Sequence, residues 1–103
     1  MKFATTRISS SVASSADSRL VPATHVVAVV HGTRTVLLDP RRGRYYGLDE
    51  VGGRIWALAL KERSVREIVR LLVEEFDVDP STLEHVVGEV LETLRVKGLV
   101  VRK

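Results

Sequence analysis

Residues 34–48, Arg-Thr-Val-Leu-Leu-Asp-Pro-Arg-Arg-Gly-Arg-Tyr-Tyr-Gly-Leu, decide the fold class of this 103-residue chain. Both ends of the stretch, Arg34 to Leu38 and Arg44 to Leu48, carry the β-branched, aliphatic and aromatic residues that are typical of strands. The middle is a turn sequence, because Asp39 can accept hydrogen bonds from the backbone that follows it, proline presets φ and Gly43 accepts a positive φ. The stretch therefore predicts an antiparallel hairpin.

A third strand precedes this hairpin. His25 to His31 is β-branched and apolar, and Gly32-Thr33 provides a short turn into the next strand. Two close turns between three strands predict an antiparallel meander with the last strand at its edge. In that last strand Tyr46 and Leu48 share one face, and Tyr45 points to the other.

Helical periodicity begins after Leu48. Asp49 is expected to cap a first helix, whose glycines Gly52 and Gly53 predict a backbone packed closely against another element. Ser64 and Glu67 have the spacing of a capping box and predict the start of a second helix. A third helix is expected from about Pro80 to Lys97.

The order of elements predicts an α+β domain, in which three helices cover one face of a three-stranded antiparallel sheet. Leu99 to Val101 can add a last strand. Residues 1–22 are rich in serine and lack apolar periodicity, so we expect a disordered tail, with the domain spanning residues 23–103. The formal net charge is +3. Residues 1–23 hold three cations and one acid, and the remainder holds 13 basic and 12 acidic residues, so the domain itself is nearly neutral.

Little in the sequence indicates catalysis. The chain has no cysteine, and its three histidines lack acidic partners at metal-ligand spacing. No glycine-rich phosphate loop, calcium loop or membrane-spanning apolar run is present. We therefore expect a protein that is not an enzyme, with no cofactor and no metal, and we place it in the cytoplasm.

Two features remain for binding. The first is the basic hairpin tip, Arg41, Arg42 and Arg44, which is also typical of a soluble turn; the second is the third strand together with the third helix. The edge strand would leave backbone N–H and C=O groups unpaired, and Gly47 has no side chain to obstruct an approaching backbone. The apolar surface of the third helix spans about 140° at 100° per residue, wider than the ~100° of a simple surface helix. An extended peptide could add to the edge and pack on that helix, or the whole apolar arc could be core. The residues alone favour neither. The predicted peptide-binding residues are Arg44, Tyr45, Tyr46, Gly47, Leu48, Leu83, Val86, Val87, Val90 and Leu94.

An ordered series of short motifs resembles the PqqD-like family of leader-recognition domains from ribosomal peptide pathways. The series comprises Leu37-Leu38-Asp39, Gly43, Tyr45-Tyr46, Leu48-Asp49, Gly52 or Gly53, Ile55-Trp56, Ser64-Val65-x-Glu67-Ile68, Phe76-Asp77-Val78, Val90-Leu91-x-x-Leu94 and Gly98-Leu99. The resemblance implies a winged helix-turn-helix fold without catalytic activity, and a cleft between the third strand and third helix for a precursor's leader peptide. Val86 departs from the family, many of whose members carry an acid there.

The closest resemblance within the family is to stand-alone recognition proteins of lasso peptide biosynthesis. It implies two partners, a precursor leader peptide and a separate leader peptidase or other modifying enzyme. A recognition protein for a radical-enzyme pathway such as pyrroloquinoline quinone synthesis is the alternative. A winged-helix DNA-binding protein is a weaker alternative, because the third helix carries Glu84, Glu89 and Glu92, whereas a major-groove helix should be basic.

Overall fold

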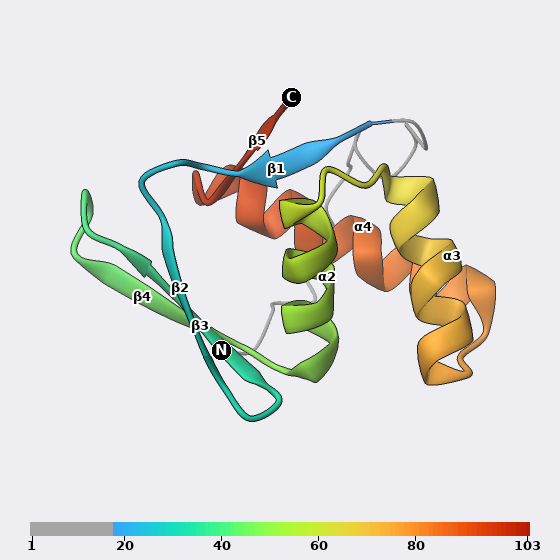
Figure 1. The fold of residues 1–103 in the computed structure, drawn as a ribbon. Helices are drawn as coiled ribbons and strands as arrows, with labels where there is room; N and C mark the ends of the chain where they lie inside the picture. Colours follow the sequence, from blue (N-terminus) through green and yellow to red (C-terminus); the bar gives the residue numbers. More distant parts are fainter. Residues whose placement is uncertain (1–17) are drawn as a thin grey trace.

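The three predicted strands form one antiparallel sheet in the computed structural model, which describes residues 18–103 (Figure 1). Strands β2 (Val27–His31), β3 (Arg34–Asp39) and β4 (Arg44–Leu48) lie in the order β2-β3-β4. Leu38 is paired with Val27 on one side and Tyr45 on the other. The meander is confirmed, with β2 beginning two residues later than expected and β3 ending one residue later.

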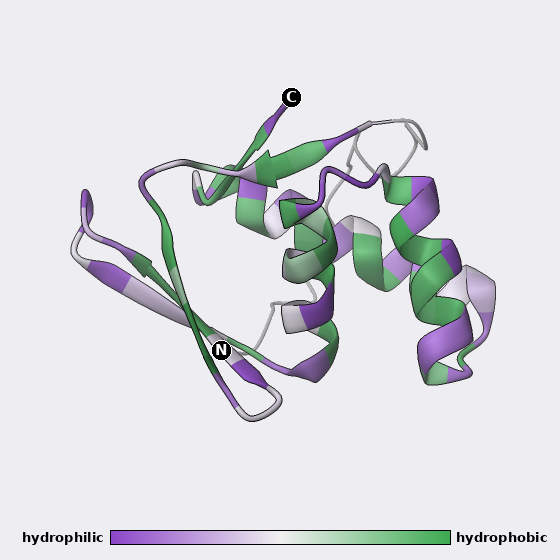
Figure 2. Cartoon of the chain, viewed as in Figure 1, coloured by the Kyte–Doolittle hydropathy of each residue, from purple (hydrophilic) through white to green (hydrophobic). Residues whose placement is uncertain are grey.

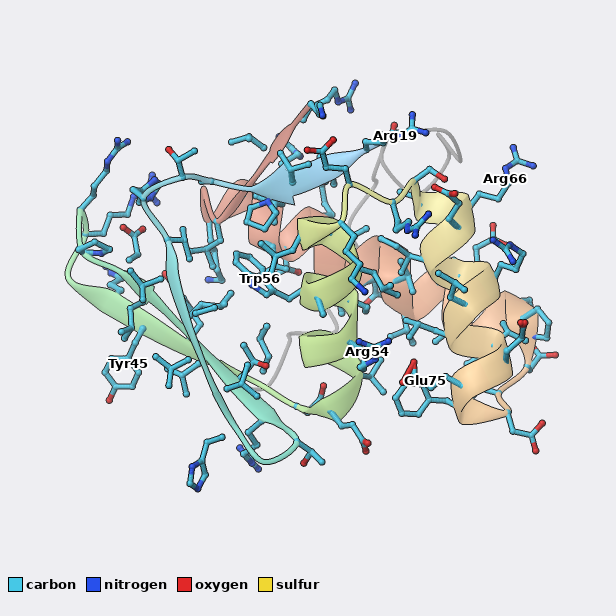
Figure 3. All side chains as sticks on the ribbon, viewed as in Figure 1. Arg19, Tyr45, Arg54, Trp56, Arg66 and Glu75 are labelled. Atoms are coloured by element: carbon cyan, nitrogen blue, oxygen red, sulfur yellow. The ribbon has the colours of Figure 1, made fainter. Side chains whose placement is uncertain are left out.

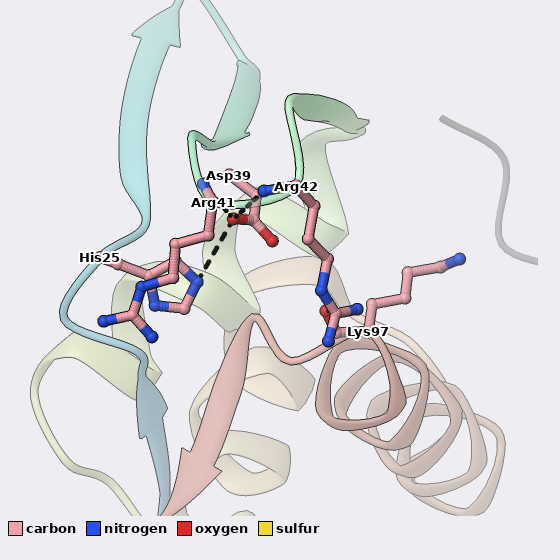
Figure 4. A network of polar contacts seen from close by, with 5 residues as sticks. All are labelled: His25, Asp39, Arg41, Arg42 and Lys97. Carbon is pink, nitrogen blue, oxygen red and sulfur yellow. Dashed lines mark hydrogen bonds and ion pairs between the residues drawn. The ribbon is translucent and has the colours of Figure 1, made fainter.

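Asp39 holds the β3–β4 turn together (Figure 4). Its Oδ1 accepts hydrogen bonds from the backbone N–H groups of Arg41 at 3.0 Å and Arg42 at 3.3 Å. The Nε2 atom of His25 lies 3.4 Å from the same oxygen, and Gly43 closes the turn with a φ of +64°. The buried carboxylate is thus enclosed by the turn that the sequence predicted from it.

Three helices follow the sheet: α2 (Glu50–Leu60), α3 (Val65–Phe76) and α4 (Pro80–Val96). Asp49 caps α2 by accepting a hydrogen bond from the N–H of Gly52 at 2.8 Å. Ser64 and Glu67 form the predicted capping box of α3, with distances of 3.2 and 2.9 Å. Each predicted helix is therefore present and begins where its cap satisfies backbone donors that have no partner within the helix.

Helix α2 packs directly on the sheet at a glycine. A Cβ atom on Gly53 would lie 2.8 Å from Oγ1 of buried Thr35 in β3. Only a residue without a side chain permits this approach. The close packing predicted from the two glycines is confirmed for Gly53.

A second sheet joins the two ends of the described chain. Strand β1 (Leu20–Pro22) pairs antiparallel with β5 (Val100–Arg102), and Leu20 is 1% exposed. The prediction that the disordered tail extends through residue 22 is therefore wrong for Leu20–Pro22. Their pairing partner lies about 80 positions further along the chain, so the neighbouring residues carry no sequence pattern that indicates the strand. Residues 1–17, the rest of the predicted tail, lie outside the described residues.

The hydrophobic core lies between the inner face of the β2-β3-β4 sheet, the three helices and the β1-β5 ribbon (Figures 1 and 2). Leu37 and Leu48 contribute from the sheet, and Ile55, Leu72 and Leu94 from the helices. All five side chains are inaccessible to solvent. Within residues 18–103, no helix combines the length and apolar character needed to cross a bilayer.

Candidate peptide-binding edge

Strand β4 is an edge of the three-stranded sheet, as predicted. Among the described residues it pairs with β3 alone. In an antiparallel pair, alternate residues direct their N–H and C=O groups away from the neighbouring strand. The free side of β4 is consequently a template on which an extended peptide can form backbone hydrogen bonds.

The side chains of β4 divide between two faces of the sheet. Leu48 is buried in the core and Tyr46 packs against the core, so both point toward the helices. Tyr45 is 75% exposed and lies on the opposite face, directed away from the helices (Figure 3). The Tyr45 side chain is therefore remote from the predicted cleft. Only the backbone of Tyr45 can form hydrogen bonds with a strand added beside β4.

The C-terminal end of α4 lies next to the inner face of β4. The Nζ atom of Lys97 is 5.3 Å from the centre of the Tyr46 ring. From the hairpin tip, Nη1 of Arg42 donates a hydrogen bond to the carbonyl oxygen of Lys97 at 3.3 Å (Figure 4). The two contacts place the C-terminal end of α4 beside β4 and the hairpin tip, and the direction of the Lys97 side chain indicates which side of α4 faces the strand.

Residues on that side of α4 follow from helix geometry. At 100° per residue, Val86, Val90, Thr93 and Lys97 fall within about 60° of one another. Val86, Thr93 and Lys97 are half-buried, whereas Val90 is 5% exposed. Thr93 and Lys97 were not among the predicted residues, although their spacing from Val86 and Val90 in the sequence indicates the same side of the helix.

Five of the ten predicted peptide-binding residues belong to the buried core: Leu48, Leu83, Val87, Val90 and Leu94. Leu83, Val87 and Leu94 are buried among the sheet and the other helices. They offer no surface to a peptide in this structure because the apolar arc of α4 is largely occupied by internal packing. Of the predicted residues on α4, only Val86 and, at its border, Val90 remain in the candidate site, which Thr93 and Lys97 extend.

Charge is unevenly distributed around this edge. Arg44 begins β4, and Arg42 and Lys97 lie at the same end of the strand. On α4, buried Glu92 pairs with Arg95 at 2.6 Å, and this hydrogen bond raises the pKa of Arg95 above its ordinary value. The end of β4 nearest the hairpin tip is therefore cationic, which favours acidic groups on a peptide bound there.

The site offers binding groups and no metal-ligand cluster. No group of three or more histidine and acidic side chains within residues 18–103 is arranged to hold a metal ion. The acidic run from Glu74 to Asp79 places Asp79 at the N-cap of α4, where it accepts a hydrogen bond from the N–H of Thr82 at 3.0 Å. That carboxylate thus has a structural role in capping.

An open sheet edge flanked by the end of a helix defines a small α+β domain suited to binding an extended chain. The family model described as "Coenzyme PQQ synthesis protein D (PqqD)" matches residues 34–100. This chain belongs to the PqqD family. No curated protein matches the sequence.

Solved structures agree with the family assignment. TbiB1, solved in complex with the TbiA(beta) leader peptide, is 35% identical, with a TM-score of 0.74 over 78% of this chain and 93% of TbiB1. A lasso peptide synthetase B1 complexed with the leader peptide is 20% identical, with a TM-score of 0.74 over 81% of this chain and 98% of the other.

A third match is the PqqD part of PqqCD from Methylobacterium extorquens, described as a stand-alone recognition element for ribosomally synthesized and post-translationally modified peptides. It is 24% identical, with a TM-score of 0.68 over 81% of this chain and 88% of the other. The second and third matches show a shared fold. The predicted α+β class and the PqqD resemblance are confirmed, and the winged helix-turn-helix description stays a prediction.

Proposed function

We propose that this protein binds the leader of a ribosomally made precursor peptide as a strand added to β4, and delivers it to a separate leader peptidase or other modifying enzyme. The observation that carries the proposal is the open edge of β4 beside α4, in a chain 35% identical to a protein solved with a leader peptide bound. The motif series that resembles lasso peptide recognition proteins, together with a TM-score of 0.74 to a lasso peptide synthetase B1, supports lasso peptide biosynthesis as the pathway.

In the proposed complex the contacts are divided between backbone and side chains. Arg44, Tyr45 and Gly47 contribute through the backbone of β4, together with Tyr46 and Leu48, whose side chains form its inner face. Val86 supplies an apolar contact from α4, and Val90 supports it from beneath. Gly47 leaves space for the incoming backbone.

The expected affinity follows from these contacts. A micromolar to nanomolar complex needs about −8 to −12 kcal/mol. About five strand hydrogen bonds at ~0.5–1.5 kcal/mol each, with two or three buried apolar leader side chains at ~1.5–3 kcal/mol each, reach that range before the cost of ordering the peptide. The surplus is small, so each apolar contact contributes measurably.

The proposal assigns no catalysis to this chain and places it in the cytoplasm, where a ribosomally made precursor is first available. Two of the matched structures support the binding role, because both are complexes with a leader peptide. In this proposal, chemistry on the precursor belongs to the partner enzyme.

Recognition in pyrroloquinoline quinone synthesis is the second candidate function, and the family match favours it. The sequence identities of 35% to TbiB1 and 24% to the PqqCD domain place the lasso pathway first. DNA binding is third, because acidic side chains follow α4 along its length and its cations gather at its C-terminal end.

Hydrogen exchange with and without a leader peptide tests the site directly. The probe is the TbiA(beta) leader peptide with which TbiB1 was solved, and its affinity is measured first by fluorescence polarisation. We expect slower exchange of amides in β4, while β2, the other edge of the same sheet, stays unchanged. Protection of β2 instead, or no saturable binding, would contradict the proposal. A steep loss of DNA affinity with salt in a gel-shift series would support the DNA alternative.

A further inference from the structure

The outer face of the β2-β3-β4 sheet is apolar, although it is turned away from the core. An antiparallel sheet with one solvated face ordinarily alternates apolar inward and polar outward residues. Here Val27, Leu38 and Tyr45 form one row across the three strands, and Val29 and Val36 continue it in the next row. The outward-facing positions of this sheet are therefore apolar, and packing in the core does not account for them.

These side chains remain accessible in the folded chain. Val27 and Val29 are each 50% exposed, and Leu38 and Tyr45 are also exposed. Figure 2 shows hydrophobic colouring along much of β2, and Figure 3 shows Tyr45 directed away from the helices. A hollow of about 330 Å³ between Val27, Leu38 and Tyr45 gives the face a shallow recess. We define the outer face as Val27, Val29, Val36, Leu38 and Tyr45.

The rim of the outer face is cationic. Of the four arginines among residues 25–48, Arg34 and Arg44 border this face, whereas Arg42 donates to the carbonyl oxygen of Lys97 on the helix side. The one acid of this segment, Asp39, is buried within its turn. Arg44 borders the hollow at one end. At the other end, Arg34 and His31 form the next cross-strand pair on the same face as Val29 and Val36.

This combination argues against a second copy of the chain as the occupant. Two copies packed face to face would bring like-charged rims together, which is unfavourable. The exposed apolar area is on the order of 400 Å², a size at which surface patches are often functional.

We propose that the outer face is the docking surface for the enzyme that receives the bound leader, and that this enzyme presents an apolar patch bordered by acidic side chains. The inference rests on the proposed function for the identity of the partner, and it names a surface that meets the leader site only at Tyr45, which offers its backbone to the leader and its side chain to the outer face. The outer face and the inner face of β4 lie on opposite sides of one sheet, so leader and enzyme can be bound at the same time.

The test uses the full chain and a purified leader peptidase that cleaves the precursor whose leader this chain binds, with affinity measured by biolayer interferometry. Val29→Glu places a charge on the outer face, and Val30→Glu is the matched control, because Val30 is the next residue of β2, points to the other face and is 71% exposed. We expect Val29→Glu to weaken enzyme binding at least tenfold and Val30→Glu less than twofold. Arg34→Glu should also weaken binding and reduce its salt dependence.

Leader affinity separates this inference from the proposed function. Both valine variants should bind the leader within twofold of wild type, because neither residue belongs to the β4 edge. Equal effects of Val29→Glu and Val30→Glu on enzyme binding, or no binding of the enzyme by the wild-type chain, would overturn the docking surface while leaving leader binding intact. A dimer in sedimentation velocity that Val29→Glu dissociates would assign the face to a second copy and overturn the inference.

Discussion

Val86→Asp is the substitution that tests the candidate site most directly. Val86 lies on the same side of α4 as Lys97, whose side chain contacts the Tyr46 ring, and it is half-buried rather than fully buried in the core. A leader strand beside β4 covers the part of Val86 that is exposed in the free protein. Val90→Asp would place a charge at a position only 5% exposed, so its loss of binding would be confounded with loss of folding.

The magnitude follows from area and desolvation. Covering about 40 Å² of valine surface contributes about 1 kcal/mol at ~25 cal/mol per Å². A carboxylate under the bound strand adds about 1–3 kcal/mol, because it loses water without a hydrogen-bond partner. Together these terms give about 2–4 kcal/mol, which corresponds to a dissociation constant about 30-fold to 1,000-fold higher.

The assay is fluorescence polarisation with a labelled leader peptide, and Val96→Asp is the matched control. Val96 is in the same helix and 66% exposed, and it lies about 80° around the helix from Val86. We expect Val96→Asp to change affinity less than twofold. Circular dichroism and a thermal midpoint establish that both variants fold. Equal leader affinities for two folded variants would refute the placement of the leader against α4.

Three further predictions concern the fold that supports this edge. Gly53→Ala should destabilise the protein by about 1–2 kcal/mol in urea unfolding, because the added Cβ would lie 2.8 Å from Oγ1 of Thr35. In a Thr35→Ala background the same substitution should stabilise the protein by up to ~1 kcal/mol, because alanine has the higher helix propensity. An effect of the same sign in both backgrounds would contradict the contact. The N–H of Ser64 donates a hydrogen bond to Glu67 and lowers the pKa of that carboxyl below 4.5. The contribution of ionised Glu67 to stability is therefore full above pH 4.5 and is lost as the pH falls through the folded-state pKa. Thermal unfolding from pH 7 to 3 should accordingly show a weaker acid dependence for Glu67→Gln than for the wild type. An identical acid dependence would count against the capping box. Leu20→Ala should cost about 2–4 kcal/mol of unfolding free energy in urea, and a loss under 1 kcal/mol would contradict its place in the core.

Elements defined by neighbouring residues were predicted well. Asp39 and Gly43 fixed the hairpin turn, Ser64 with Glu67 fixed the start of α3, and each does so through hydrogen bonds or backbone angles within a few residues. The edge position of β4 also followed from the sequence, because short turns leave a three-stranded meander little choice of strand order.

The candidate site was predicted only in part. A helical wheel orders the residues of α4 relative to one another, yet it does not indicate which part of a wide apolar arc meets the core. The contact between Lys97 and Tyr46 decides that orientation, and it joins residues 51 positions apart. Leu83, Val87 and Leu94 were therefore assigned to a peptide surface that internal packing occupies.

The amino-acid sequence by itself determined the order and type of the elements, the caps and turns that bound them, the near-neutral charge of the domain and the series of motifs that marks the PqqD family. Tertiary structure alone decided that Leu20–Pro22 completes a ribbon with Val100–Arg102, that the face carrying Tyr45 is the one turned away from the helices, and which side of α4 borders β4. The physical reason is the sequence separation over which the interactions act. Caps, turns and periodicity arise from residues within one or two turns of each other, whereas these three features arise from burial and pairing between segments that the chain brings together only when it folds.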